Sequence, residues 1–299
     1  MSGARGSGPG AHSGEPLVSI VLPTRNRAEL LAGAVASCLE QTYRALELVV
    51  VDDASDDGTP EVVSAMRDPR LRYVRLHRHL GLPGALNAGF ALAAGEYLTW
   101  TSDDNRYEPE AVEVMLGFLR DNPRYGMVYC DFWEVDPGGK RVRRQVEDPS
   151  FLWTANVVGA CFLYARRVYL EVGDYDPELA LAEDYDYWLR VHGRYEMAAL
   201  HLPLYRFLAH TGSLTALRRD EVARAARRAR WKNRRTWPME RRVLGNLGDL
   251  GWQDWIARRA RRPLTHVRDA VRLRSRVRAA LLAARGRSAE ARALWRGPA

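Results

Sequence analysis

Two adjacent carboxylates, Asp103 and Asp104, follow a short apolar segment that begins at Tyr97, and Asn105 comes directly after them. Neighbouring carboxylates repel one another, so folding alone does not favour this arrangement. A bound divalent cation removes the repulsion, because carboxylate oxygens are suitable ligands for hard ions such as Mg²⁺ and Mn²⁺. A metal held by one or two carboxylates usually completes its shell with water and substrate phosphates. The segment therefore predicts a metal–diphosphate site, with a solvated Asp-rich turn as the alternative.

Polar residues also follow two earlier apolar runs. Residues 17–22 run into the polar segment 23–27, and residues 46–51 run into the Asp-rich segment 52–58. Continuous apolar runs fit strands that are buried on both faces, as in a parallel sheet. In open α/β sheets, ligands bind beyond the carboxyl ends of the strands. Three polar strand ends therefore indicate one shared ligand site.

The segments between these runs have helical patterns. Apolar residues recur at helical spacing in 28–40, Pro60 fits the first turn of a second helix, and a third helix is predicted over 83–94, ended by Gly95. Residues 71–76 alternate like a strand. The resulting alternation of strands and helices predicts an α/β protein with a parallel, doubly wound sheet.

Five short segments share a further pattern: VSIVLPTRNR at 18–27, EQTY at 40–43, VVDDASDDGT at 50–59, GALNAG at 84–89 and GEY at 95–97. In this order and at this spacing they resemble the family 2 glycosyltransferases, a nucleotide-sugar-dependent group with the GT-A fold. The resemblance implies a Rossmann-like, mostly parallel central sheet flanked by helices over residues 16–215. Residues 16–105 would form the nucleotide-binding half, and 106–215 the acceptor half.

The resemblance also implies which residues contact the nucleotide: Pro23, Thr24, Arg25, Asp53, Asn87, Ser102 and Asp103. A carboxylate at Asp53 can accept a hydrogen bond from the imide N–H of uracil or thymine, so the expected donor is a UDP or dTDP sugar. For Asn87, a polar contact within its helix is an equal alternative. Asp52, Asp56 and Asp57 are expected to stabilise a turn and a helix start.

The family's metal motif commonly has the pattern Asp-x-Asp-Asp, whereas this chain has Thr101-Ser102-Asp103-Asp104. The resemblance therefore implies Mn²⁺ or Mg²⁺ held by Asp103 with support from Asp104. Thr101 lacks the first carboxylate, which should weaken the hold on the cation or on the ribose. His210 matches a family histidine near the metal or diphosphate, although a lone histidine is more often structural.

Glu183 and Asp184 match the Glu-Asp motif at the start of an acceptor-side helix in this family. The resemblance implies that Asp184 is the general base of an inverting transfer and that Glu183 binds the acceptor or supports the geometry. General-base assistance contributes roughly a hundredfold to ten-thousandfold in rate. The alternative is that both acids complement the helix dipole. Trp153, Asn156 and Gly159 fall where the acceptor and sugar pocket begins; core packing is the alternative for Trp153.

Charge divides the chain of 299 residues, which has a net charge of +8. Residues 218–299 contain 24 Lys and Arg against 7 Asp and Glu. This basic region, taken as 216–299, is predicted to be helical over 218–235, 241–247, 252–262 and 264–285. It could pack on the acidic catalytic domain, contact an anionic membrane or a lipid-linked acceptor, or bind nucleic acid. Residues 1–15 are expected to be a disordered leader.

The expected function is metal-dependent, inverting glycosyl transfer to an unidentified acceptor hydroxyl, in cell-surface polysaccharide, glycolipid or secondary-metabolite synthesis. The alternatives are a sugar-phosphate nucleotidyltransferase, which the Gly-free 23–27 segment disfavours, a nucleotide-sugar-binding protein without activity, and a nucleic-acid binder. The three cysteines are scattered, and no apolar run reaches the roughly 18–20 residues that span a bilayer. We expect a cytoplasmic protein, able to associate with the inner membrane face and to form homo-oligomers.

Overall fold

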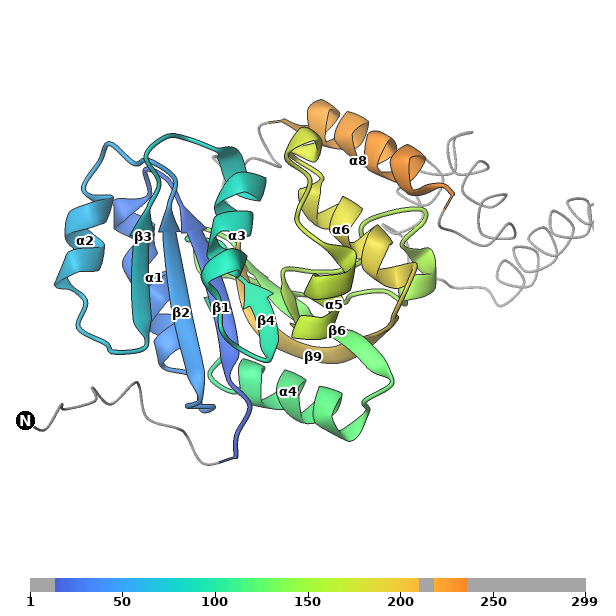
Figure 1. The fold of residues 1–299 in the computed structure, drawn as a ribbon, viewed down its shortest axis with the longest axis horizontal. Coiled ribbons are helices and arrows are strands. Elements are labelled where there is room, and N and C mark those ends of the chain that lie inside the picture. Colours follow the sequence, from blue (N-terminus) through green and yellow to red (C-terminus); the bar gives the residue numbers. More distant parts are fainter. Residues whose placement is uncertain (1–13, 210–217, 236–299) are drawn as a thin grey trace, which may run out of the picture.

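The computed structural model describes residues 14–209 and 218–235 of the chain (Figure 1). The strands are β1 (Val18–Thr24), β2 (Leu46–Asp52), β3 (Leu71–Arg75), β4 (Tyr97–Trp100), β5 (Arg106–Tyr107), β6 (Tyr125–Val135), β7 (Arg141–Arg144), β8 (Cys161–Ala165) and β9 (Glu196–Leu208). The helices are α1 (Ala28–Leu39), α2 (Thr59–Ala65), α3 (Gly81–Leu92), α4 (Ala111–Asp121), α5 (Arg166–Val172), α6 (Glu183–His192) and α8 (Arg219–Asn233), with short 3₁₀ turns η1 (Pro149–Phe151) and η2 (Pro177–Leu179).

The described strands form one sheet in the order β3-β2-β1-β4-β8-β6-β9-β5. Strand β7 lies off this path and pairs antiparallel with β6. Strands β1 to β4 pair in parallel, as the sequence predicts. Beyond β4 the sheet is mixed: β8 is antiparallel to both β4 and β6, whereas β6 and β9 are parallel. Parallel pairing is thus complete in the first half of the domain, where βαβ crossovers impose that direction. The second half combines the parallel β6–β9 pair with antiparallel pairs.

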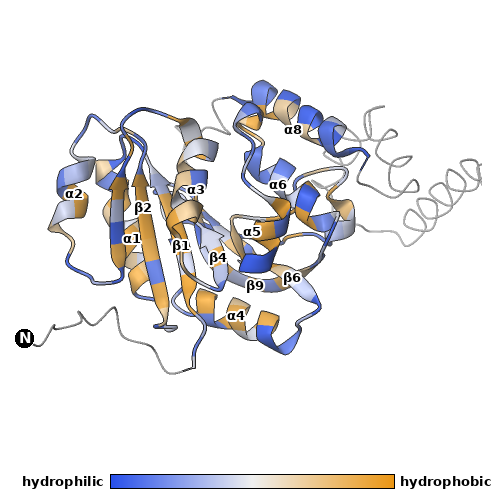
Figure 2. Ribbon diagram, in the orientation of Figure 1, coloured by the Kyte–Doolittle hydropathy of each residue, from blue (hydrophilic) through white to orange (hydrophobic). Residues whose placement is uncertain are grey.

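The central strands are apolar because helices cover both of their faces. Every residue of β1 is buried, and Figure 2 shows β1 and β2 as largely hydrophobic ribbons between α1 and α3. Val21, Val49 and Val51 belong to the core cluster that includes α3 residues. The alternate residues, such as Ile20 and Leu48, belong to the cluster that includes α1. Period-two alternation thus sends successive side chains of each strand into separate cores.

The predicted helix and strand boundaries of the first half hold to within two residues, and the difference at α3 has a physical cause. Helix α3 begins at Gly81, two residues before the predicted start, and its backbone becomes extended at Ala93, before Gly95. The early start arises because the Asp53 carboxylate accepts hydrogen bonds from the N–H groups of Leu80 and Gly81. Gly95 has another role: an added Cβ there would lie 2.6 Å from the backbone nitrogen of Ser19.

The basic region is described only over α8, which matches the helix predicted at 218–235. The other predicted helices of that region, the predicted leader apart from residues 14 and 15, and His210 lie outside the described residues. The three cysteines are buried free thiols. Within the described ranges, every helix is too short or too polar to cross a bilayer.

The contact between α3 and the sheet predicts an asymmetry between two helical glycines. A Cβ added at Gly89 would overlap Val21 and would lie 3.1 Å from Val51. We therefore expect Gly89→Ala to lower the free energy of unfolding by about 1–3 kcal/mol, the typical cost of overpacking a core. Chemical denaturation measures the change.

Gly117 in α4 is the matched control, because a Cβ at that position would meet nothing within 4 Å. We expect Gly117→Ala to raise the free energy of unfolding by about 0.5–1 kcal/mol through helix propensity alone. Equal changes in the free energy of unfolding for the two substitutions would show that a methyl group at Gly89 does not overpack the core against Val21 and Val51.

Candidate active site

Thr24, the last residue of β1, joins the ends of β2 and β4. Its carbonyl oxygen accepts a hydrogen bond from the Asp53 N–H at 2.9 Å. Its hydroxyl donates to Asp103 Oδ2 at 2.8 Å. The two carboxylates predicted to contact the nucleotide and the metal therefore lie on either side of one residue. The side chain of Pro23 is buried in this edge of the sheet, whereas Arg25 is exposed and Ser102 half-buried.

Asp53 is buried and already has three partners. Its carboxylate accepts hydrogen bonds from Leu80 N at 2.7 Å and Gly81 N at 2.9 Å, and His79 Nδ1 lies 2.6 Å from Oδ2. A carboxylate offers about four acceptor positions, so one remains for a ligand. Sequence reasoning missed His79; the polar run that follows β3, His77-Arg78-His79, is the signal that could have found it.

Asp52 and Asp57 hold the loop in place through their side chains, as expected, whereas Asp56 contributes its backbone N–H, which donates to Asn26 Oδ1 at 2.9 Å. Asp52 accepts from Ser55 N at 2.7 Å and from the Tyr73 hydroxyl at 2.6 Å. Asp57 accepts from Ala28 N at the start of α1 at 3.1 Å and from Thr59 N at 3.0 Å. Both side chains are therefore engaged in shaping the loop that presents Asp53.

Asp103 is the carboxylate best suited to hold a cation. Burial raises its pKa to about 6; the Thr24 hydrogen bond opposes the rise, and the charge of Asp104 adds to it. A hard cation stabilises a buried carboxylate that lies beside a second acid, so the donor set fits Mn²⁺ or Mg²⁺. Across 14–209 and 218–235, no group of three His, Cys, Asp or Glu is placed to hold a metal by itself.

Thr101, which replaces the first motif carboxylate, faces the core. It is buried, and its hydroxyl lies 2.5 Å from the hydroxyl of Tyr205 on β9. The Tyr107 ring meets the Tyr205 ring edge to face, with centroids 5.0 Å apart. A carboxylate at this position would need a charge partner there. The threonine therefore fills this buried position without introducing a charge.

Asn87 does not face the strand ends. Its side-chain oxygen accepts from Tyr175 N and its side-chain nitrogen donates to Tyr175 O, each at 2.8 Å. The Tyr175 hydroxyl in turn lies 3.0 Å from Trp100 Nε1. Both ends of the Asn87 amide thus connect α3 to the segment before η2, and a nucleotide contact by Asn87 stays a prediction. The alternative of a contact within its own helix is wrong, because the partner is 88 residues away.

Asp184 lies in the first turn of α6 and contacts a residue of the predicted acceptor pocket. Asn156 Nδ2 donates to Asp184 Oδ2 at 2.8 Å, and the Tyr185 backbone N–H donates to Oδ1 at 2.6 Å. Burial raises the pKa of Asp184, and these two hydrogen bonds oppose the rise. A half-buried carboxylate with a raised pKa and a fixed orientation is suited to accept a proton.

Glu183 is only 6% exposed, and its Oε2 has no hydrogen-bond partner among the described residues. Burial, together with the charge of Asp184, raises its pKa to about 8. A glutamic acid that stays protonated beside a carboxylate keeps the pair from carrying two charges. The structure thus raises the pKa of both adjacent acids through burial, which sequence reasoning did not predict.

Of the other two predicted pocket residues, Trp153 is half-buried against the larger core cluster. Gly159 has Phe132 as a close neighbour, since an added Cβ would lie 3.0 Å from that ring. The structure thus brings Asn156 to Asp184 directly and leaves stacking of Trp153 on a sugar as a prediction.

Among the residues that the structure describes, three other than glycine have a left-handed backbone: Asn26, Ala54 and Leu181, with φ of 54°, 58° and 75°. The first two lie in the loops after β1 and β2, and the third lies two residues before Glu183. Such conformations are costly for residues with a side chain and cluster at functional sites. Asn26 and Ala54 thus lie near Thr24 and Asp53, and Leu181 lies near Glu183 and Asp184.

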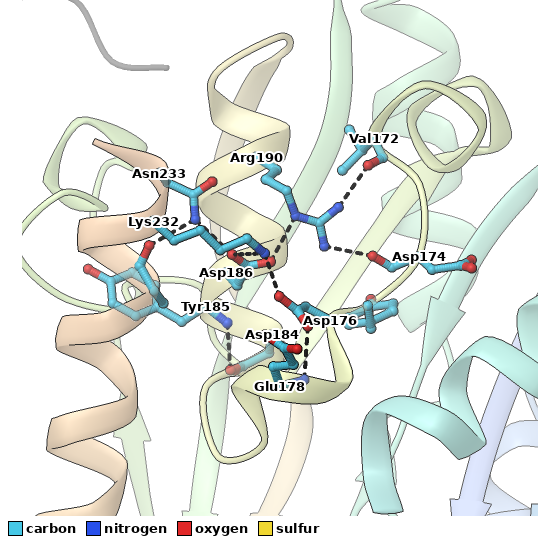
Figure 3. A network of polar contacts seen from close by, with 12 residues as sticks. Val172, Asp174, Asp176, Glu178, Asp184, Tyr185, Asp186, Arg190, Lys232 and Asn233 are labelled. Atoms are coloured by element: carbon cyan, nitrogen blue, oxygen red, sulfur yellow. Dashed lines mark hydrogen bonds and ion pairs between the residues drawn. The ribbon is translucent and has the colours of Figure 1, made fainter. Parts of the chain in front are cut away.

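A buried acid next to the site fastens α8 to α6 (Figure 3). Asp186 is fully buried and pairs with Arg190 at 2.8 Å, Lys232 at 3.1 Å and Asn233 at 2.7 Å. Lys232 also pairs with Asp176 at 2.6 Å. The part of the basic region that the structure describes is therefore packed on the helix that carries Asp184.

Comparison with known proteins identifies related sequences for this domain. The model of the family described as glycosyl transferase family 2 matches residues 19–181. An uncharacterized glycosyltransferase of Rickettsia bellii is 31% identical over 191 residues, which cover 59% of this chain and 27% of that protein. The chondroitin synthase of Pasteurella multocida is 31% identical over 183 residues, covering 59% of this chain and 19% of the synthase. The chain thus spans a minor part of the length of these relatives.

Solved structures show the same fold. The S. aureus TarS 1-349 structure in complex with UDP aligns with a TM-score of 0.60 at 16% identity, covering 93% of this chain and 87% of that one. The Pyrobaculum calidifontis mannosyltransferase PcManGT in complex with GDP-Man and Mn²⁺ aligns with a TM-score of 0.59 at 21% identity, covering 93% and 85%. At these identities the likeness shows the GT-A-type architecture.

The raised pKa of Glu183 predicts that stability depends on pH. Between its ordinary pKa of 4.5 and about 8, the unfolded chain releases a proton that the folded chain keeps, so the free energy of unfolding falls as the pH rises through that range. We expect Glu183→Gln to gain stability over the wild type from about pH 5 to about pH 8, by about 3 °C or more in Tm.

Thermal unfolding at several pH values measures this difference, and the exposed Glu29→Gln in α1 is the control. Its difference from the wild type should not change with pH. Parallel Tm curves for Glu183→Gln and the wild type would contradict a protonated Glu183.

Proposed function

The chain belongs to glycosyl transferase family 2, and on that premise we propose that it transfers a glycosyl group from a nucleotide-diphosphate sugar to an acceptor hydroxyl. The observation that supports this most directly is a pair of hydrogen bonds at Thr24: its carbonyl oxygen accepts from the Asp53 N–H, and its hydroxyl donates to Asp103. They bring together the predicted nucleotide contact and the predicted metal ligand. One nucleotide diphosphate can contact Asp53 with its base and a cation at Asp103 with its phosphates only if these two carboxylates lie close together.

We propose that Mn²⁺ or Mg²⁺, held by Asp103 with support from Asp104, neutralises the charge on the leaving diphosphate. Oxygen ligands and few protein carboxylates are typical of ions that share their shell with substrate phosphates. Burial of Asp103 strengthens its interaction with a cation. Because the described residues provide fewer than three clustered ligands, metal binding should be strongest when the nucleotide is present.

Asp184 is proposed as the general base of a transfer with inversion. The acceptor oxygen forms a bond to the anomeric carbon while the bond from that carbon to the diphosphate oxygen breaks, and the hydroxyl proton passes to the Asp184 carboxylate. Asn156 orients that carboxylate through its 2.8 Å hydrogen bond. Burial raises the pKa of Glu183 to about 8, which disfavours a second negative charge next to the base.

For the donor we propose a UDP or dTDP sugar. The one acceptor position left on Asp53 suits the imide N–H of a pyrimidine dione. Structures of TarS with UDP and of PcManGT with GDP-Man support a nucleotide diphosphate, and they do not select the base. Release of nucleoside diphosphate from a panel of UDP, dTDP and GDP sugars with Mn²⁺ tests the proposal; release from none of them would overturn it.

The assignment of Asp184 predicts that Asp184→Asn separates chemistry from donor binding. We expect transfer, or donor hydrolysis when no acceptor is known, to fall at least about a hundredfold, because general-base assistance contributes that much or more. The affinity for UDP with Mn²⁺, measured by calorimetry, should stay within about twofold. The exposed Asp121→Asn at the end of α4 is the charge-matched control. Full turnover by Asp184→Asn would remove Asp184 from the mechanism.

The assignment of Asp103 as a metal ligand predicts that its substitution weakens the binding of UDP with Mn²⁺, unlike that of Asp184. Asp103→Asn keeps the Thr24 hydrogen bond possible but removes the charge, so the enhancement of UDP affinity by Mn²⁺ should be lost. We expect at least about a tenfold loss of affinity with Mn²⁺ present and little change with EDTA. If Mn²⁺ enhances UDP binding equally in Asp103→Asn and the wild type, the cation is held elsewhere.

A further inference from the structure

A large groove lies between α8 and the segment 176–181, about 1110 Å³ in volume. We call it the arginine groove. The α8 residues that line it recur at helical spacing and so share one face of that helix: Arg218, Glu221, Arg224, Ala225, Arg227, Arg228, Trp231 and Lys232. Asp176, Glu178 and the residues up to Leu181 form the opposite wall. Neither the proposed donor site nor the core accounts for these cationic side chains.

The cations of the groove fall into two groups. Arg218 pairs with Glu221, and Lys232 pairs with Asp176 and the buried Asp186. Arg224, Arg227 and Arg228 are exposed and form no hydrogen bond or ion pair within the described part of the chain, although Arg224 is near enough to Glu221 to help lower the pKa of that acid. Glu178 is the one other acid in the described lining. The three guanidinium groups repel one another along one helix, and an anion in the groove removes that repulsion.

The spacing of these arginines suits phosphate groups. Arg224 and Arg228 are one helical turn apart, a rise of about 6 Å, so both can reach a single diphosphate or two neighbouring phosphates. Guanidinium groups bind phosphate oxygens through paired hydrogen bonds, which gives both strength and orientation. Trp231 is 64% exposed beside them, with the Arg234 guanidinium 3.8 Å from its ring centroid. It offers a flat apolar surface for the rest of the ligand.

The groove is close to the proposed base. Leu181 lines the groove, and Asp184 follows three residues later, so their Cα atoms are at most about 11 Å apart. Lys232 of α8 forms ion pairs both with Asp176 in the groove wall and with Asp186 of α6 (Figure 3). The groove therefore adjoins the helix that carries Asp184.

We propose that the arginine groove binds the phosphate or diphosphate group of the acceptor and thereby presents the acceptor hydroxyl to Asp184. This inference rests on the proposed glycosyl transfer and specifies its acceptor as a phosphorylated compound. The donor diphosphate belongs to the separate site at Asp103. Binding at the groove requires no metal, since the arginines themselves supply the positive charge.

The test uses inorganic pyrophosphate as the probe, with the full-length protein and EDTA present, so that a cation cannot recruit the probe to Asp103. Calorimetry compares the wild type with the triple variant Arg224→Gln/Arg227→Gln/Arg228→Gln. The matched control is Arg120→Gln/Arg219→Gln/Arg235→Gln, which removes three exposed arginines that do not line the groove. We expect at least about a tenfold loss of pyrophosphate affinity in the groove variant and less than about a twofold change in the control.

Three results would overturn the proposal. The first is equal affinity of the groove variant and the wild type. The second is an equal loss in both triple variants, which would indicate unspecific attraction to a basic protein. The third is absence of pyrophosphate binding while vesicles of phosphatidylcholine and phosphatidylglycerol bind the wild type but not the groove variant, which would make the surface a membrane contact.

UDP binding with Mn²⁺ in the same variants separates this proposal from the proposed function. Preserved UDP binding in both triple variants shows that they are folded and that the donor site is independent of the groove. If the groove result is negative while UDP binds and UDP sugar is hydrolysed, the acceptor assignment fails and glycosyl transfer stands. If the wild type neither binds nor hydrolyses any nucleotide sugar, the proposed function fails, whatever the groove binds.

Discussion

The parallel register of β1 with its two neighbours is the constraint on which the candidate site depends. Thr24 lies opposite Asp52 of β2, and Val21 lies opposite Trp100 of β4. This register places the polar residues after each strand at the same edge of the sheet, where Thr24 can bond in both directions. A shift of one residue would turn the hydroxyl into the core, because side chains alternate faces along a strand. The strands are apolar throughout, so helix packing on both faces holds the register.

Buried acids in this domain differ in whether the protein compensates their charge. Asp52 and Asp186 are fully buried, and each is paired with a cation and a hydrogen-bond donor, as expected of structural carboxylates. Asp103 and Glu183 have no cation within ion-pair distance among the described residues, and their pKa values are raised to about 6 and about 8. This contrast separates groups that hold the fold together from groups that are available to a ligand.

The two halves of the molecule meet through side chains that no single segment predicts. Asn87 binds the backbone of Tyr175 across 88 residues, and the Tyr175 ring stacks on Tyr187 of α6 with centroids 4.2 Å apart. Asp186 of the same helix is held by Lys232 and Asn233 of α8. The helix that carries Asp184 is thus fixed on one side by α3, through Asn87 and Tyr175, and on the other by α8.

The sequence by itself determined the elements of the first half and the residue types at the strand ends, because apolar periodicity and turn chemistry are local. It also predicted α8 and the turn-forming roles of Asp52 and Asp57. Only the tertiary structure decided that Thr101 faces Tyr205, that Asn87 faces Tyr175 and that the sheet becomes mixed beyond β4. It also decided that Oε2 of Glu183 is buried with no hydrogen-bond partner among the described residues and that His79 contacts Asp53. Each of these depends on contacts between segments distant in the chain, and burial and pKa have no counterpart in residue spacing.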